Sequence, residues 1–352
     1  MPAPAARYRR KLTAIDLFSG CGGLTLGLKQ AGFQVVAAVE LDASAVATYR
    51  SNHPEVLVKH GDIRRLSPPG LRRALGLRAG ELDLLAGCPP CQGFSALRTL
   101  NGAKDTADRR NRLIYQMLRF ARAFRPKAVM MENVPALLHQ KSFRRLGRGL
   151  EKLGYKLTFG VKNAANYGVP QRRRRLILLA GKAVEIPFAP ESRRLRTVGG
   201  AIRRMPVVGR SRDPLHNMPE KRLTRIARLI RDIPKNGGSR TDLPMARQLP
   251  CHRKSDGFHD IYGRMSWSEV APTITSGCFN PSKGRFLHPE LDRNITMREA
   301  AILQGFPKKY FFDVSLGKEA IALLIGNALP PEFIRRNALS IRGVITRRIG
   351  AG

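Results

Sequence analysis

Long apolar runs are missing from this sequence, and so are internal repeats and low-complexity tracts. The longest apolar stretches, residues 176–180 and 320–325, have the size of a strand or a short helix, whereas a membrane span needs about 20 apolar residues. Basic residues near the N-terminus have no apolar stretch behind them, so we expect no secretory signal. The sequence therefore predicts a cytoplasmic chain that does not engage a membrane.

Acidic side chains are scarce. The 352 residues include 63 Lys and Arg but only 26 Asp and Glu, which gives a formal net charge of +37. A field of this sign attracts polyanions, above all nucleic acid. An arginine-rich composition that serves only solubility is one alternative, and an acidic membrane surface is a weaker one because no lipidation motif occurs. The charge favours nucleic-acid binding and association with the nucleoid.

Cysteines are few, and their number is odd. They stand at positions 21, 88, 91, 251 and 278, and an odd number without an export signal indicates reduced thiols rather than a disulfide framework. Hydrophobic residues make up 43% of the chain, which is enough for a substantial core and excludes wholesale disorder.

The first half of the chain alternates short apolar runs with helical patterns. Near-continuous apolar strands that alternate with helices indicate an α/β fold with a doubly wound, mostly parallel sheet covered on both faces. The predicted strands are residues 14–18, 35–39, 56–58, 82–86, 127–131, 156–161 and 176–180. The predicted helices are residues 24–31, 43–50, 109–124 and 143–153.

The composition shifts near residue 185, where the strand–helix rhythm stops. Residues 191–240 contain 14 Lys and Arg against 4 Asp and Glu. A basic amphipathic helix is predicted over residues 223–233, either as an ordinary surface helix or as one that contacts phosphates. Its apolar face would carry Leu223, Ile226, Leu229, Ile230 and Ile233, opposite Arg225, Arg228 and Arg231. We expect a smaller domain at 187–285, inserted between the two parts of a larger domain, 1–186 and 286–352.

A glycine-rich turn follows the first predicted strand in Asp16-Leu-Phe-Ser-Gly-Cys-Gly-Gly23. Glycines there let the backbone approach a ligand whose polar end meets free helix N–H groups. Glu40 ends the second strand, where an acid can hold a ribose, and Asp62 ends the third, where it can accept from an adenine amino group. The strict dinucleotide pattern would place its third glycine at Thr25, so the motif alone is weak and NAD stays a rival ligand.

A second motif, Gly87-Cys-Pro-Pro-Cys-Gln-Gly-Phe-Ser95, follows the predicted strand 82–86. Cys88 and Cys91 have the spacing of a redox dithiol, but a polar loop rather than a helix comes next. Half of a zinc site is a second interpretation, although no further Cys/His pair completes it. A buried structural thiol fits poorly with the flanking prolines. The remaining hypothesis is a nucleophilic thiolate.

Two further motifs are charged. Glu132 emerges from the apolar strand 127–131, where partial desolvation would favour its protonated form and make it a proton donor; a satisfied buried acid is the alternative. Residues 171–175, Gln-Arg-Arg-Arg-Arg, lead into the strand 176–180. Alternation along a strand places Arg173 and Arg175 on one side, with Arg172 and Arg174 on the other.

Taken together, these segments resemble the DNA (cytosine-5) methyltransferases. The resemblance rests on the glycine-rich turn, Pro90-Cys91-Gln92, Glu132-Asn-Val134 and residues 171–175, in that order. It continues in residues 296–307, Thr-Met-Arg-Glu-Ala-Ala-Ile-Leu-Gln-Gly-Phe-Pro, and in residues 326–331, Gly-Asn-Ala-Leu-Pro-Pro. Only the middle of the basic segment lies outside it. The family likeness implies a Rossmann-like fold with an inserted target-recognition domain.

The resemblance also implies a mechanism. Cys91 would attack C6 of a cytosine, protonated Glu132 would donate to N3, and Arg175 would hold O2 with support from Arg173. The methyl donor would be S-adenosylmethionine, released as S-adenosylhomocysteine, and no metal is implied. Cofactor contacts are expected from Phe18, Gly20, Gly22, Gly23, Glu40, Asp62, Ile63 and Asn327.

The implied substrate is double-stranded DNA with the target base flipped out of the helix. The loop from Gln92 to Asn111 is expected to act as a mobile clamp. Contacts with DNA are expected from Gln92, Ser95, Arg109 and Arg110. We expect a monomer, with a cognate restriction or defence system as a further partner.

Two rival functions stay open at this point. The tRNA-methylating branch of the same family has similar motifs, and Cys278-Phe-Asn280 weakly matches its Cys-Phe-Thr. Residues 273–277 and 284–289 look more like the DNA-modifying enzymes. A dinucleotide-dependent oxidoreductase, which would use Cys88 and Cys91 as a dithiol, is the rival from another class.

Overall fold

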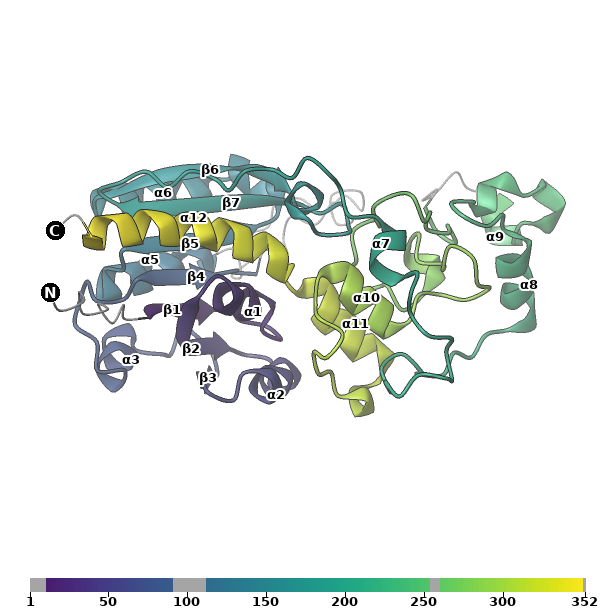
Figure 1. The fold of residues 1–352 in the computed structure, drawn as a ribbon, viewed down its shortest axis with the longest axis horizontal. Coiled ribbons are helices and arrows are strands. Elements are labelled where there is room, and N and C mark those ends of the chain that lie inside the picture. Colours follow the sequence, from purple (N-terminus) through teal and green to yellow (C-terminus); the bar gives the residue numbers. More distant parts are fainter. Residues whose placement is uncertain (1–10, 91–111, 254–259, 351–352) are drawn as a thin grey trace, which may run out of the picture.

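A seven-stranded sheet forms one lobe of the molecule, and a second lobe with little regular structure lies beside it (Figure 1). The computed structural model describes residues 11–90, 112–253 and 260–350. The strand order is β3-β2-β1-β4-β5-β7-β6. The strands are β1 (Leu12–Leu17), β2 (Phe33–Glu40), β3 (Leu57–His60), β4 (Leu84–Gly87), β5 (Ala128–Asn133), β6 (Tyr155–Asn163) and β7 (Arg174–Lys182).

The sheet is parallel except at β7. Strands β1 to β5 pair in parallel, whereas β7 runs antiparallel to both β5 and β6. The prediction of a doubly wound, mostly parallel sheet is therefore confirmed. Because β7 is reversed, it begins at the edge where β5 ends, and Glu132 and Asn133 pair with Ile177 and Leu176.

Helices cover both faces of the sheet. Separate hydrophobic clusters form on the two faces. One face carries α1 (Gly23–Gln30), α2 (Ala43–Asn52) and α12 (Pro331–Gly350), and the other carries α3 (Pro68–Ala74), α5 (Ile114–Phe124) and α6 (Lys141–Lys152). Most of these bounds lie within a few residues of the predicted ones; α3 and α12 were not predicted.

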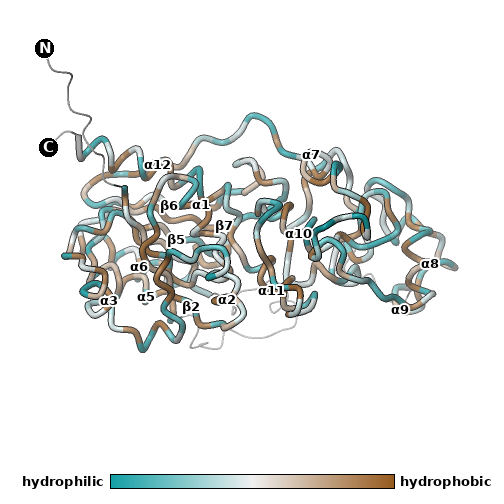
Figure 2. Tube along the Cα trace, turned by 60° about the horizontal axis from the view of Figure 1, so that its bottom comes forward, coloured by the Kyte–Doolittle hydropathy of each residue, from teal (hydrophilic) through white to brown (hydrophobic). Residues whose placement is uncertain are grey.

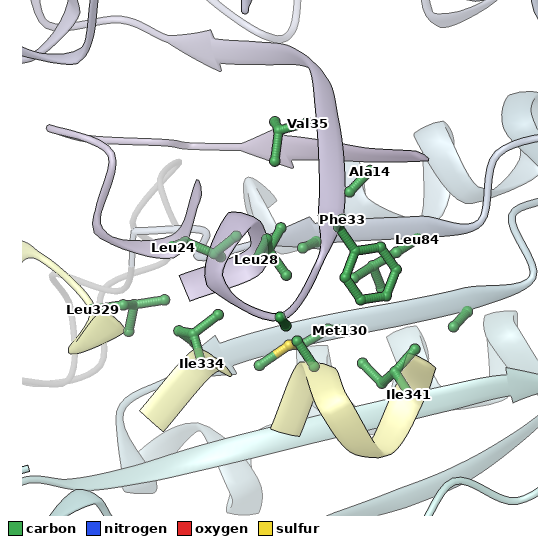
Figure 3. Close-up of a cluster of buried hydrophobic side chains, with 14 of the residues drawn as sticks. Ala14, Leu24, Leu28, Phe33, Val35, Leu84, Met130, Leu329, Ile334 and Ile341 are labelled. Atoms are coloured by element: carbon green, nitrogen blue, oxygen red, sulfur yellow. The ribbon is translucent and has the colours of Figure 1, made fainter. Parts of the chain in front are cut away.

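The two ends of the chain meet in the core of the first lobe. Leu24 and Leu28 of α1 and Ile334 of α12 point toward Leu84 and Met130 of the sheet (Figure 3). A Cβ at residue 27, a glycine in α1, would lie 2.5 Å from the carbonyl oxygen of residue 331. Glycine there allows the two helices to touch. The last helix thus completes a core that the first strand begins.

The second lobe consists mainly of short helices and loops, and the hydrophilic segment that leads into α7 connects it to the sheet (Figure 2). Its α-helices are α7 (Val198–Ile202), α8 (Thr224–Asp232), α9 (Pro250–Arg253), α10 (Met297–Gln304) and α11 (Gly317–Asn327). The 3-10 turns of the chain are η3 (Pro135–His139), η4 (Ala164–Tyr167), η5 (Arg240–Asp242), η6 (Met245–Arg247), η7 (Pro281–Lys283) and η8 (Val314–Leu316). One hydrophobic cluster joins α7 to α10 and α11. Helices that follow residue 285 therefore pack against the segment proposed as an inserted domain, whose boundaries stay a prediction.

The amphipathic helix predicted at 223–233 is present as α8. Leu229, Ile230 and Ile233 are buried, as expected, but Leu223 is 63% exposed because it precedes the first helical residue. None of the helices in the described ranges is both long enough and apolar enough to cross a membrane.

Candidate active site

The predicted site residues gather at one edge of the sheet. Strands β1 to β5 end there and β7 begins there, so the segments after five strands and before a sixth come together although they are far apart in sequence. Open α/β sheets bind ligands at this edge. The site therefore lies where the strand-end motifs predicted it.

The turn after β1 contains three residues with positive φ, a backbone conformation that favours glycine. Phe18, Gly20 and Gly22 have φ values of 60°, 53° and 96°. The Gly20 N–H donates to Oε2 of Glu40 at 2.8 Å, and the N–H groups of Leu41 and residue 42 donate to Oε1 at 2.7 and 2.9 Å. No atom lies within 4 Å of the position that a Cβ of Gly20 would take. The turn thus faces open space, with a fixed carboxylate beside it.

Gly23 begins α1, and Asn327 ends α11; the start of α1 contacts the segment that follows α11. A Cβ at Gly23 would lie 2.5 Å from the carbonyl oxygen of Leu329, so glycine lets the start of α1 touch the segment that follows α11. Asn327 ends α11 and is exposed. The structure therefore brings the segment that follows Asn327 next to the start of α1.

Asp62 and Ile63 follow β3. Asp62 accepts hydrogen bonds from the backbone N–H of Arg64 at 2.9 Å and from its Nη2 at 2.6 Å. These bonds lower the pKa of Asp62 to about 2, so its carboxylate is ionised at neutral pH. Ile63 is buried, and Arg119 of α5 donates to the carbonyl oxygens of Ile63 and Leu66. Arg119 therefore fixes the loop that carries Asp62.

A buried acid and an arginine form the centre of the edge. Glu132, at the end of β5, is only 2% exposed, and its Oε1 lies 2.8 Å from Nε of Arg175. Its Oε2 accepts a hydrogen bond from the thiol of Cys88 at 2.9 Å. Burial and the nearby carboxylate raise the pKa of Cys88 well above its usual value, which keeps this sulfur protonated as a donor.

The segment after β4 is tied to the same acid-bearing strand. Nδ2 of Asn133 donates to the carbonyl oxygen of Pro89 at 2.9 Å, and the N–H of Cys88 donates to the carbonyl of Leu17. These bonds fix the chain two residues before position 91. The predicted residues Cys91, Gln92, Ser95, Arg109 and Arg110 lie outside the described residues.

Arg173 is buried rather than directed at solvent. It is 3% exposed, and its Nη1 and Nη2 donate to the carbonyl oxygens of Ile274 and Gly326 at 3.0 and 2.9 Å. Burial and the charge of Arg175 lower the pKa of Arg173 to about 9. Arg172 and Arg174 are exposed, so the predicted alternation is present. Because its guanidinium binds main-chain carbonyls, Arg173 can support Arg175 only by holding the chain at the start of β7.

Two features of the site escaped the sequence analysis. Asp16 is fully buried and accepts from the hydroxyl of Thr25 at 2.7 Å; burial raises its pKa to about 7. The contact between Cys88 and Glu132 joins positions that are 44 residues apart, and only the assignment of both to strand ends hinted at it. Within the described ranges, no three His, Cys, Asp or Glu side chains are grouped as metal ligands.

Comparison with known proteins identifies the family. Residues 12–342 match the family model of the C-5 cytosine-specific DNA methylases. Type II methylase M.HgiDII of Herpetosiphon aurantiacus is 34% identical over 343 residues, which cover 93% of this chain and 94% of the relative. Type II methyltransferase M1.HphI of Haemophilus parahaemolyticus is 34% identical over 92% of this chain and 85% of its own.

The chain belongs to the C-5 cytosine-specific DNA methylase family.

Solved structures agree with this membership. A putative DNA modification methyltransferase from an Escherichia coli prophage superposes with a TM-score of 0.69 at 25% identity, over 95% of this chain and 99% of its own. The S. pombe Dnmt2 methyltransferase shares the fold, with a TM-score of 0.62 at 18% identity over 95% and 99% of the two chains. The resemblance stated from the motifs is confirmed, and the protein is a DNA (cytosine-5-)-methyltransferase. The oxidoreductase alternative is wrong, because the match covers the chain from β1 to α12.

Proposed function

We propose that this methylase transfers a methyl group from S-adenosylmethionine to C5 of a flipped-out cytosine in a short motif of duplex DNA. The observation that carries the proposal is the buried Glu132 carboxylate, held between Arg175 and the Cys88 thiol at the edge where strand ends converge. The carboxyl group of Glu132 and the guanidinium of Arg175 together offer hydrogen-bond donors and acceptors that are complementary to those on one edge of cytosine.

The residues around the turn after β1 fit the proposed cofactor. Gly20 leaves open space beside the backbone, and Glu40 holds its carboxylate next to that space. Asp62 is ionised and able to accept from an amino group. Leu41 is 65% exposed although apolar, so it offers a surface on which a flat ring can pack. Phe18 and Ile63 would border the adenine, and Asn327 the methionine end.

The cofactor, when bound, supplies an electrophilic methyl group on a sulfonium centre. The protein must make C5 of cytosine nucleophilic. The thiolate of Cys91 would add to C6, and the electron pair of the C5–C6 bond would shift into the ring. Protonated Glu132 would donate its proton to N3 as this charge develops, and Arg175 would hold O2. Loss of the C5 proton and departure of the Cys91 thiolate then release 5-methylcytosine.

The two nearby cysteines are suited to different tasks. The raised pKa of Cys88 makes its thiolate scarce, whereas a nucleophile needs the thiolate form. The environment of Cys88 therefore argues against Cys88 as the nucleophile, which leaves that role to Cys91, and gives Cys88 the role of a donor to Glu132. Arg173 would act as a positioning residue, because it anchors the start of β7 while Arg175 faces Glu132.

A covalent trap tests the proposal. Duplex DNA that carries 5-fluorocytosine should form a stable adduct with the wild type, because fluorine cannot leave as the C5 proton does. Cys91→Ala should abolish methyl transfer and the adduct, while Cys88→Ala should keep substantial activity. Recovery of the adduct on Cys88 would refute the assignment. Bisulfite sequencing of DNA from a methylation-free host that expresses the protein would identify the motif.

We also propose that a restriction system is a partner of this methylase. M.HgiDII and M1.HphI, the two relatives compared above, are named as Type II enzymes. A monomer that acts on duplex DNA is the form we propose. Methyl incorporation into tRNA equal to that into duplex DNA would contradict the DNA assignment, and transfer to tRNA alone would favour the tRNA-methylating alternative.

A further inference from the structure

The helices behind the sheet carry an unusual concentration of positive charge. Residues 112–152 include ten Lys and Arg but only two acids, Glu132 and Glu151, and Glu132 is buried in the active site. Residues 23–52 on the opposite face have two basic and two acidic residues. Helix α12 on that face is also basic, with five arginines and one acid, but four of these arginines bind Glu332 or main-chain carbonyls.

Helix α6 holds half of these ten basic residues. Phe143, Leu146 and Leu150 bury its apolar face, and its exposed face carries what we call the α6 cation row: Lys141, Arg144, Arg145, Arg148 and Lys152. Arg145 stacks over the ring of Tyr115 in α5 at 5.3 Å. The other four have no hydrogen-bond or ion-pair partner in the part of the chain that the structure describes.

The spacing of the row is unfavourable for the helix itself. Lys141 and Arg145, Arg144 and Arg148, and Arg148 and Lys152 stand four residues apart, and like charges at this spacing repel. The first turn of α6 has no acid, so Lys141 also opposes the helix dipole. By contrast, arginines of α12 on the other face have partners, such as Glu332 for Arg335. A feature that destabilises its own helix indicates a function.

The cation row starts at the catalytic edge. Helix α6 begins after η3, which directly follows β5 and Glu132, and α5 runs beside it. A Cβ at Gly149 would lie 2.4 Å from a methyl carbon of Leu118, so glycine allows the two helices to pack closely. Arg112 and Arg122 of the α5 segment are exposed as well. Exposed basic residues thus occur along both helices, from the edge where DNA would be held to the far end of α6.

We propose that the α6 cation row binds phosphates of duplex DNA that continues beyond the catalytic edge. This proposal rests on the proposed function, because it takes its ligand from the DNA held at that edge. The 12 residues of α6 span about 18 Å at 1.5 Å per residue. This length equals the rise of about five base pairs at roughly 3.4 Å each, so the row is long enough to reach several phosphates of the duplex.

The salt dependence of DNA binding tests this proposal. A 30-base-pair duplex of random sequence is titrated with the full-length wild type, with K141Q/R144Q/R148Q, and with R50Q/K308Q/K309Q as a control. The control removes the same charge from exposed positions around α2 on the other face. Loss of three phosphate contacts should lower the slope of log K against log salt by about 2.7. Between 50 and 200 mM salt, the wild type would then lose about 40-fold more affinity than the α6 variant.

The outcomes are distinct. A slope reduced by about 2.7 in the α6 variant and unchanged in the control supports the proposal. Equal slopes for the wild type and the α6 variant, or equal reductions in both variants, overturn it. A larger effect on binding to duplex RNA or to phosphatidylglycerol vesicles than to DNA overturns it in favour of another polyanion. If the triple variant does not fold, single R148Q and K152Q variants should each lower the slope by about 0.9.

Methyl transfer separates this proposal from the proposed function. Incorporation of labelled methyl groups into genomic DNA is measured at saturating DNA for the wild type and the α6 variant. Because the cation row does not touch the reacting base, the α6 variant should keep its turnover number. A wild type that does not methylate DNA contradicts the proposed function, while the slopes still decide whether α6 binds phosphates.

Discussion

Among the residues that the structure describes, Arg264 is the largest fully buried side chain. Its replacement gives the sharpest prediction for the second lobe. Its guanidinium donates at 2.6–3.1 Å to four main-chain carbonyls, those of Ile230, Ile233, His288 and Leu291, and to the Asp292 carboxylate. Two of these carbonyls belong to the end of α8. The helical donor for Ile230 would be residue 234, a proline without an N–H. Arg264 supplies the missing donor.

The expected loss of stability follows from this geometry. Arg264→Met keeps most of the volume but removes the side-chain donor from the carbonyls of Ile230, Ile233 and His288, whereas the carbonyl of Leu291 still accepts from the N–H of Arg293. Each unsatisfied group costs about 1–3 kcal/mol, and water reaching some of them lowers the sum, so we expect the second lobe to lose about 4 kcal/mol. Arg228→Met is the matched control, because Arg228 is exposed on α8, and its effect should stay within about 0.5 kcal/mol.

The chain contains a probe in the right place. Its single tryptophan, Trp267, packs edge-on against His288 and lies under the guanidinium of Arg203 in the second lobe. Urea unfolding followed by tryptophan fluorescence therefore reports this lobe, while calorimetric titration with S-adenosylmethionine reports the first. A change of less than 1 kcal/mol in the fluorescence transition of Arg264→Met would show that the carbonyl network does not stabilise the lobe as argued.

Three further predictions concern the first lobe and its junction. Asp16 keeps its proton up to about pH 7 in the folded state but only to about 3.8 when unfolded, so the free energy of unfolding should fall by a few kcal/mol as the pH rises through this window. Asp16→Asn should remove this pH dependence, measured as the change in urea midpoint between pH 4.5 and 7.5. The same pH dependence in the wild type and the variant would refute the prediction. Gly326→Ala places a Cβ 2.3 Å from backbone atoms and should lower the free energy of unfolding by about 2–3 kcal/mol. Gly343→Ala is the control and should not destabilise the fold, because its Cβ would meet open space. Similar melting temperatures for the two variants would contradict this prediction. Arg175→Met leaves the Glu132 carboxylate buried without a cation, so it should lower the stability by about 3–5 kcal/mol and abolish methyl transfer. A variant that keeps both the wild-type melting temperature and the wild-type methyl-transfer activity would contradict the pairing of Arg175 with Glu132.

The edge of the sheet could be predicted because each of its residues follows a strand. Glu40, Asp62 and Glu132 end apolar runs, and the carboxyl ends of parallel strands meet at one edge. The distance between Glu132 and Arg175 could not be predicted, because it depends on the reversed direction of β7. Strand patterns in a sequence carry no sign of direction.

The second lobe was beyond the reach of sequence patterns. Its order comes from buried side chains that bind carbonyls, such as Arg264, and a sequence marks an arginine as an exposed residue. Few of its segments have a helical or strand period, and the helix predicted there is α8. The packing of α10 and α11 against α7 is a contact between distant segments, which periodicity does not encode.

The junction of the two lobes gives a reason for burying the charged side chain of Arg173, although burial of a charge is unfavourable. Arg173 joins the start of β7 to the 274 segment of the second lobe and to the end of α11, and Gln171 adds bonds to the carbonyl of Leu303 and the N–H of Ile274. An apolar side chain at position 173 would leave both carbonyls without donors. The same strand carries Arg175 two residues later, so the bonds that fix the second lobe also fix the arginine that faces Glu132. Any shift of the second lobe that breaks the Arg173 bonds should therefore misplace the Arg175 guanidinium, which couples the position of the second lobe to the pairing of Arg175 with Glu132.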